Sequence, residues 1–208
     1  MEVCAAPTFP FPARRERTRF SIVNHLQRAI EDSIATFRAC AALEQPVQRA
    51  ADLIFRCLTG GHKLLVCGNG GSASDATHLA TEILCRFLDD RRPYPALSLT
   101  ANGEFLTAVC NDYGADEIFA RQVWGLGQKG DVLIALTTSG KSRNVLLALE
   151  KAKQLGLESI CLLGRDGGFT KGAATLDLIA PGPNTATKSS AHTSEFTERL
   201  ETSRSLAK

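Results

Sequence analysis

The chain has 208 residues, of which 44% are hydrophobic and 22% charged, and its formal net charge is +2. This length suits one domain with a sizeable core, and the balanced charge gives no reason to expect direct nucleic-acid or membrane binding. No apolar run approaches the roughly 20 residues that a membrane-spanning helix needs. The composition therefore predicts a soluble globular protein.

Cysteine usage and the N-terminus indicate the compartment. Seven cysteines are scattered along the chain, without a C-x-x-C pair. This pattern suits a reducing compartment better than a disulfide framework. The first 13 residues contain three prolines and lack the apolar stretch of a secretion signal. We therefore expect a cytoplasmic protein in which residues 1–18 form a disordered lead.

The segment from about Phe20 to Leu58 has the periodicity of helices. Its apolar residues recur at three- and four-residue steps, which predicts two helices with a break near Glu44–Pro46. Gly60 and Gly61 end the second helix. An apolar helix pair of this kind would suit a subunit interface. The stripe on the first helix consists of Ile22, Leu26, Ile30, Ile34 and Phe37.

Five short apolar runs follow, and helix-like segments separate them. Their apolarity is continuous rather than alternating, which indicates strands buried on both faces, as in a parallel sheet. Strands that alternate with helices predict a doubly wound α/β fold, in which the loops after the strands share one edge and bind ligands there. The runs are Lys63–Gly68, Pro95–Leu99, Asp131–Thr137, Ser159–Gly164 and Leu176–Pro181.

Two of the junctions after these runs combine glycine with hydroxyl side chains. Cys67–Asp75 contains three glycines, whose backbone N–H groups can approach an anion, and either Ser72 or Ser74 is a candidate helix cap. Thr137–Ser142 places four hydroxyls around one glycine, which suits a phosphate monoester. Neither junction has the spacing of a P-loop or of a dinucleotide fingerprint. One such loop alone is more often a capped turn, but two of them favour phosphate binding.

Two further motifs carry polar chemistry. His78 and Glu82 lie four residues apart in a helical segment, so imidazole and carboxylate share one face. Such a pair either binds a divalent metal, shares a proton in acid–base catalysis, or is an exposed ion pair. Asn111–Gly114 is typical of an Asx-type turn before a helix.

Taken together and in order, these motifs resemble the phosphoheptose isomerase family, the sedoheptulose 7-phosphate isomerases of the SIS fold. The resemblance covers about residues 20–186. It implies a flavodoxin-like, three-layer α/β/α domain over residues 19–186, with a five-stranded parallel sheet and an N-terminal helical pair. The matching segments are Gly68–Asp75, His78 with Glu82, Asn111–Gly114, Phe119–Gln122, Gly130–Leu133, Thr138–Ser142 and Gly164–Gly168.

The resemblance also implies an activity and an assembly. Family members are homotetramers with active sites shared between subunits. They interconvert sedoheptulose 7-phosphate and D-glycero-D-manno-heptose 7-phosphate, which leads to activated heptose for lipopolysaccharide and other bacterial surface glycans. By motif position, the substrate-binding residues would be Asn69, Gly70, Gly71, Ser72, Asn111 and Asp112, and the phosphate-binding residues Thr137, Thr138, Ser139 and Ser142.

The same resemblance makes His78 and Glu82 ligands of one zinc ion per subunit, and Glu82 a catalytic acid–base as well. Chemistry supports this assignment. An aldose–ketose isomerisation moves a proton between adjacent carbons through an enediolate, so it needs a base next to the carbonyl and stabilisation of the enediolate oxygens. We expect Glu82 to be that base and His78 to orient it or hold the metal.

The C-terminal tail, residues 187–208, departs from the family pattern. The family ends in a helix with a Gln-Glu-x-His motif and a second, catalytic His, whereas this chain has Ser189 and Thr197 near the expected Gln and second His, and His192 at the motif's first His. Either the tail has diverged and the protein is non-enzymatic, or a shifted reading frame near Ala186 has replaced the family sequence. The catalytic activity of the chain depends on which explanation holds.

Two other functions remain open from the sequence. One is a non-catalytic SIS scaffold, because a close relative of the family binds the replication initiator DnaA as a tetramer. The other is a sugar-phosphate-sensing module or an SIS isomerase for a different ketose phosphate.

Overall fold

A computed structural model describes residues 22–86 and 90–181. The expected lead over residues 1–18 and the expected atypical tail over residues 187–208 lie outside these ranges. Residues 19–21 and 182–186, which the sequence assigns to the domain, lie outside them too. Across the described ranges, every helix is too short or too polar to span a bilayer.

The centre of the molecule is a parallel sheet of five strands in the order β2-β1-β3-β4-β5. This order is flavodoxin-like, as expected. Each strand lies within two residues of its predicted run at either end. The strands are β1 (Leu64–Gly68), β2 (Ala96–Ser98), β3 (Val132–Thr137), β4 (Glu158–Leu163) and β5 (Leu176–Ile179).

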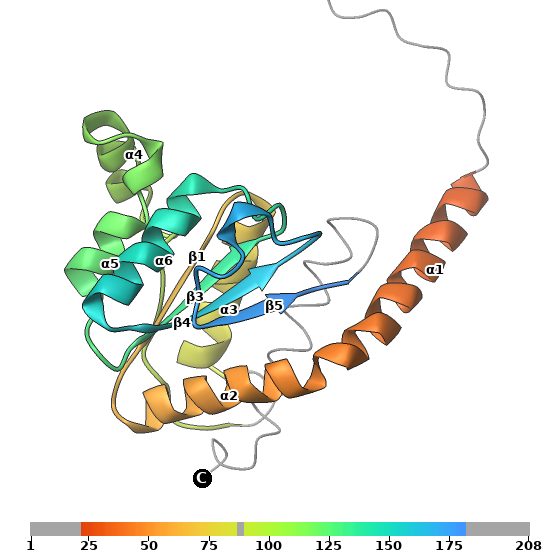
Figure 1. The fold of residues 1–208 in the computed structure, drawn as a ribbon, viewed down its shortest axis with the longest axis horizontal. Helices are drawn as coiled ribbons and strands as arrows, with labels where there is room; N and C mark the ends of the chain where they lie inside the picture. Colours follow the sequence, from red (N-terminus) through yellow and green to blue (C-terminus); the bar gives the residue numbers. More distant parts are fainter. Residues whose placement is uncertain (1–21, 87–89, 182–208) are drawn as a thin grey trace, which may run out of the picture.

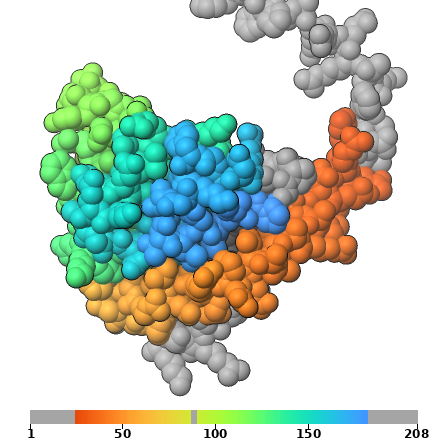
Figure 2. All heavy atoms as spheres, in the orientation of Figure 1, coloured from red at the N-terminus to blue at the C-terminus, as the bar shows by residue number. Residues whose placement is uncertain are grey.

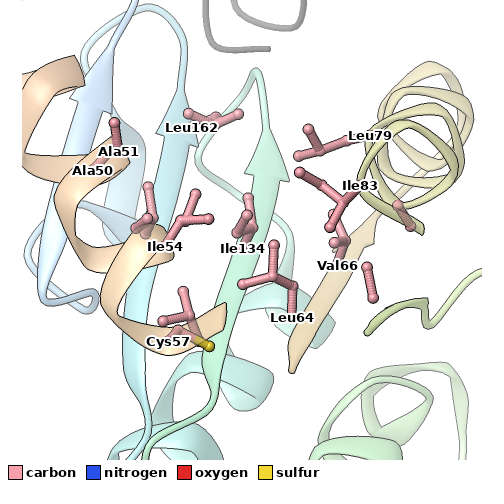
Figure 3. Packing of buried hydrophobic residues seen from close by; sticks show 14 of the residues in the cluster. Ala50, Ala51, Ile54, Cys57, Leu64, Val66, Leu79, Ile83, Ile134 and Leu162 are labelled. Carbon is pink, nitrogen blue, oxygen red and sulfur yellow. The ribbon is translucent and has the colours of Figure 1, made fainter. Parts of the chain in front are cut away.

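Helices cover both faces of the sheet (Figure 1). On one face, α2 (Glu44–Thr59) and α3 (Gly71–Leu84) pack against every second strand residue, and Figure 3 shows Ile54 and Leu79 converging on Ile134. On the other face, α5 (Ala120–Leu126) and α6 (Arg143–Leu155) contribute to a second buried cluster, which contains the intervening strand residues. The central strands are apolar without alternation because both faces are buried, and each fully buried Leu or Ile contributes about 1.5–3 kcal/mol.

The N-terminal helix α1 (Ile22–Cys40) projects from this body (Figures 1 and 2). A short 3-10 helix, η1 (Ala41–Leu43), joins it to α2, so the break falls a few residues before the expected position at Glu44–Pro46. The reason is that Pro46 lies in the first turn of α2, where a missing N–H leaves no intrahelical bond unmade. The predicted stripe of α1 faces away from the core, because Leu26, Ile30, Ile34 and Phe37 are 63%, 50%, 46% and 46% exposed.

The remaining elements are α4 (Gly103–Asp112) and two 3-10 helices, η2 (Ala115–Glu117) and η3 (Gly168–Thr170). Asn102 caps α4 by accepting a hydrogen bond from the backbone N–H of Phe105 at 3.0 Å. The expectation of an Asx-type turn at Asn111–Gly114 is wrong for its first half. Asn111 and Asp112 are the last residues of α4, and the chain leaves the helix at Tyr113.

Candidate active site

The two glycine- and hydroxyl-rich loops meet at the carboxyl edge of the sheet. They follow β1 and β3, which are neighbours, and the strand order runs in opposite directions on either side of this pair. Such a switch point is where open α/β sheets bind ligands. The amides of Asn69 and Asn144 join the two loops, because each Nδ2 donates to the other's Oδ1 at 2.9 Å.

The loop after β1 leads directly into α3. Gly70 is the residue before the helix, with a φ of 57° that favours glycine. A Cβ on Gly68 would lie 2.6 Å from the carbonyl oxygen of Ser72, so only glycine allows the first turn of α3 to pack this closely on the strand end. The expectation that Ser72 or Ser74 caps α3 is wrong, because the helix already begins at Gly71 and no side chain caps it. In the first turn, the N–H groups of Ser72, Ala73 and Ser74 donate to the carbonyl oxygens of Asn69 and Gly70, so among the described residues the N–H of Gly71 is the first-turn donor left for an anion.

The loop after β3 presents its hydroxyls at the start of α6. The hydroxyl oxygens of Thr137 and Ser142 lie 3.1 Å apart, and Ser139 Oγ accepts a hydrogen bond from the backbone N–H of Lys141. Thr137 is buried, whereas Thr138, Ser139 and Ser142 are half-buried. No side chain caps α6, so its first N–H groups and these hydroxyls form a group of donors suited to a phosphate monoester.

The loop after β4 holds the hydroxyl-rich loop after β3 in place. The backbone N–H and the hydroxyl of Thr170 both donate to the carbonyl oxygen of Gly140, at 3.1 and 2.8 Å. Thr170 is fully buried, and Gly140 packs against the backbone of Gly167 and Gly168. The segment Gly164–Gly168, which the sequence showed only as a matching motif, thus supports the loop that carries the hydroxyls.

His78 and Glu82 form a close pair on α3. Nε2 of His78 lies 2.8 Å from Oε1 of Glu82, the His78 side chain is 64% exposed, and the Glu82 side chain is 9% exposed. The other carboxylate oxygen of Glu82, Oε2, is buried without a hydrogen-bond partner among the described residues. A buried carboxylate oxygen in this state is costly unless a proton, a cation or a substrate donor completes it.

A hollow of about 560 Å³ reaches from the first turn of α3 to His78 of this pair. It runs along α3 from the first turn to the third, and Thr100, two residues after β2, also lines it. Its lining is mostly polar side chains, and consists of Ala73, Ser74, Thr77, His78, Thr81 and Thr100.

Asn111 and Asp112 are placed apart from this hollow. Both are exposed at the end of α4, which projects from the body of the domain (Figure 1). Their side chains bond to one another, with Asn111 Nδ2 donating to Asp112 Oδ1 at 2.8 Å. In the described part of the chain, no hydrogen bond ties either residue to the two loops. The structure therefore brings together Asn69 and the α6 loop, but not the α4 pair.

The donor set for a metal is incomplete within the described ranges. No three His, Cys, Asp or Glu side chains converge there, so His78 and Glu82 are two candidate ligands without a third. Nitrogen and carboxylate donors suit zinc, and the buried Oε2 of Glu82 offers an acceptor, but a catalytic zinc site needs three protein ligands. The pair thus supplies two of the three protein ligands of such a site.

Comparison with known proteins identifies the family. A family model described as the SIS domain matches residues 28–164. The phosphoheptose isomerase of Shewanella frigidimarina is 40% identical over 174 residues, which make up 82% of this chain and 85% of that protein. This chain belongs to the phosphoheptose isomerase family. A phosphoheptose isomerase of Helicobacter pylori is 46% identical over 148 residues, covering 71% of this chain and 77% of that protein.

The solved structures agree with this membership. The structure of a phosphoheptose isomerase from Francisella tularensis aligns with a TM-score of 0.82 and 35% identity, covering 87% of this chain and 96% of that one. The family and the five-stranded α/β fold expected from the sequence are therefore both confirmed. Sequence reasoning missed Asn144 and Thr170, although a polar residue in the first turn after a hydroxyl-rich loop is a signal that would have singled out Asn144.

Proposed function

We propose that this chain interconverts sedoheptulose 7-phosphate and D-glycero-D-manno-heptose 7-phosphate through an enediolate. Family membership makes the chain an aldose–ketose isomerase. The observation that carries the specific reaction is the buried, half-paired carboxylate of Glu82, which contacts His78 on the lining of a hollow that begins at the first turn of α3.

The length of the substrate agrees with this layout. At 1.5 Å per residue, His78 and Glu82 lie roughly 10 and 16 Å along α3 from Gly71. Helical side chains tilt toward the N-terminus, and the Glu82 carboxylate accordingly reaches back to His78. An extended chain covers about 1.2 Å per bond, so the eight bonds from C1 to phosphorus of a heptulose 7-phosphate span roughly 10 Å. A phosphate at the loops thus brings C1 and C2 near this pair.

The proton transfers can be assigned to named atoms. The Glu82 carboxylate takes a proton from C1 of the ketose, and the electron pair left behind forms the enediolate. The carboxylic acid then returns the proton to C2, while the proton on the C1 hydroxyl moves to the former carbonyl oxygen. His78 holds Oε1 of Glu82 at 2.8 Å, so it orients the carboxylate and is placed to carry that second proton.

We extend the proposal to zinc, for which His78 and Glu82 would supply two ligands. Zinc, when bound, polarises a carbonyl and stabilises negative charge on oxygen. Its remaining ligands would come from outside the described residues or from the substrate. Removal of zinc by a chelator, followed by restoration with zinc but not magnesium, is the expected behaviour, and full activity of the chelated, metal-free protein would contradict it.

We also propose a homotetramer, with the exposed stripe of α1 packed against other copies. Four large apolar side chains half exposed on one helix face are unfavourable in water and mark an interface. Replacing Ile30 and Ile34 by Glu should shift the particle toward smaller species in light scattering. The matched control is Arg28→Glu on the opposite side of α1, which should leave the mass unchanged.

The compartment and pathway belong to the same proposal. Five of the described cysteines are free thiols, which suits a reducing compartment such as the cytoplasm: Cys57, Cys67, Cys85, Cys110 and Cys161. The heptose phosphate formed would supply activated heptose for bacterial surface glycans.

Turnover of the purified protein tests the proposed reaction. We expect NMR to show the aldose phosphate forming from sedoheptulose 7-phosphate, and deuterium at C2 of the product when the reaction runs in D₂O. Ser142→Ala should weaken substrate binding, whereas Ser33→Ala should not, because Ser33 is a half-buried serine on α1 whose hydroxyl donates to the carbonyl of Ala29. A protein that binds the ketose but never converts it, with or without zinc, would refute the reaction and leave a non-catalytic scaffold.

A further inference from the structure

Three hydroxyl side chains form a cluster beside the hollow, which we call the hydroxyl cluster: Thr77 on α3, Ser98 at the end of β2, and Thr100 just after it. The oxygen of Thr77 lies 3.0 Å from each of the other two, and those two are 2.7 Å apart. Thr77 and Thr100 line the hollow, as does His78 one residue further along α3. The cluster therefore lies between the start of α3 and the catalytic pair.

The hydroxyl cluster has more acceptors than donors. Its three hydroxyl protons can serve at most three of five short oxygen–oxygen contacts. Three of these contacts are within the cluster, and in the other two Thr77 and Thr100 lie 3.1 and 3.3 Å from the carbonyl oxygen of Ala73. Its three oxygens offer six lone pairs, and among the described residues the one outside donor is the Thr100 N–H, at 3.4 Å from the Ser98 hydroxyl oxygen. Even if all three protons stay within the cluster, two lone pairs lack a donor.

This imbalance selects the chemistry of a ligand. A phosphate presents acceptor oxygens and cannot fill lone pairs that need a proton. A sugar hydroxyl carries one proton and complements an acceptor-rich surface. The phosphate has a better match in the hydroxyls and backbone N–H groups at the start of α6, so the phosphate and the sugar hydroxyls would bind at different places.

We propose that Thr77 and Thr100, oriented by Ser98, bind the hydroxyl groups of the sugar chain between its phosphate and its carbonyl, and so make the site selective for polyhydroxy substrates. This inference rests on the proposed function and adds a specificity-determining subsite to it. A site that accepts hydrogen bonds from substrate hydroxyls rejects analogues that lack them, because its own polar atoms are then left unpaired.

A purely structural role is the alternative, since the cluster also ties the end of β2 to α3. The two roles differ in what they change. A structural tie, once lost, loosens the end of β2 and the start of α3, and so weakens phosphate binding and sugar binding together. A sugar subsite changes recognition of the sugar and leaves the phosphate end unaffected.

The test replaces each threonine by valine, which keeps the shape and removes the hydroxyl. Thr77→Val and Thr100→Val should each lower kcat/KM for sedoheptulose 7-phosphate about fivefold to tenfold, the effect of one or two hydrogen bonds. Inhibition by inorganic phosphate should change less than twofold. Thr77→Ser retains the hydroxyl and should restore most of the lost activity. The matched control is Thr59→Val on α2, an exposed helical threonine whose hydroxyl donates to the carbonyl of Phe55.

The outcomes separate this inference from the proposed function. Unchanged kcat/KM in both valine variants, or a parallel loss of phosphate inhibition, overturns the sugar subsite. If the wild-type protein binds sedoheptulose 7-phosphate without converting it, the proposed reaction fails, and the same comparison made on calorimetric affinities still decides the subsite. If the wild-type protein binds no sugar phosphate, both are overturned.

Discussion

Gly140 provides a quantitative test of how the phosphate loop is held. A Cβ there would lie 1.9 Å from the carbonyl oxygen of Gly167, and its φ of 62° strains any other residue. The strain costs about 1–2 kcal/mol. Moving the neighbouring loop away also breaks the two hydrogen bonds from buried Thr170, at about 1–3 kcal/mol each. Gly140→Ala should therefore lower the free energy of unfolding by roughly 3–8 kcal/mol.

Gly61→Ala is the matched control for Gly140→Ala. Gly61 has a φ of 81° with no atom within 4 Å of the added Cβ, so only the strain of about 1–2 kcal/mol remains. Urea denaturation at one fixed protein concentration measures both variants, since assembly makes apparent stability concentration-dependent. Equal losses in the two variants would show that the contact between Gly140 and Gly167 does not hold the loop.

Further predictions concern a buried carboxylate, the thiols and the loop bridge. Burial raises the pKa of Asp131, but hydrogen bonds from Lys63 Nζ and two backbone N–H groups outweigh it and leave the pKa below the ordinary 3.8. Because the pKa of Asp131 is lower in the folded than in the unfolded chain, its ionised carboxylate stabilises the fold at pH values above the unfolded pKa. The free energy of unfolding should therefore fall as the pH drops below about 4, and Asp131→Asn should flatten this dependence on pH. A thiol reagent should modify exposed Cys85 and Cys110 first among the described cysteines, because burial raises the pKa of Cys67 to about 12. Slow modification of Cys85 and Cys110 would contradict this. Asn144→Ala should raise KM severalfold and change kcat less, and an unchanged KM would show that the Asn144 amide does not position the loop after β1.

The sequence predicted the sheet well because its signal is local. Runs such as Asp131–Thr137 are apolar throughout, since adjacent residues enter different buried clusters on the two faces. The break between α1 and α2 was placed too late, because Pro46 marks a first helical turn as readily as a helix end.

The parts of the site that the sequence did not predict depend on long-range packing. Asn69 and Asn144 are 75 residues apart, and only the adjacency of β1 and β3 brings their amides into contact. Thr77 and Ser98 are 21 residues apart and meet because α3 packs along β2. No local pattern marks such pairs. The i, i+4 spacing of His78 and Glu82, by contrast, was enough to place them on one face.

The assignment of Glu82 as the proton-transferring base is tested most directly by comparing binding with turnover in Glu82→Gln. Glutamine keeps the shape and cannot take the proton, and general acid–base catalysis contributes about 10²–10⁴-fold to a rate. We expect kcat to fall by that factor, while calorimetry finds the affinity for sedoheptulose 7-phosphate within a few-fold of wild type, and Glu150→Gln on the exposed side of α6 behaves like wild type. A Glu82→Gln protein that retains kcat within tenfold of wild type would contradict the account.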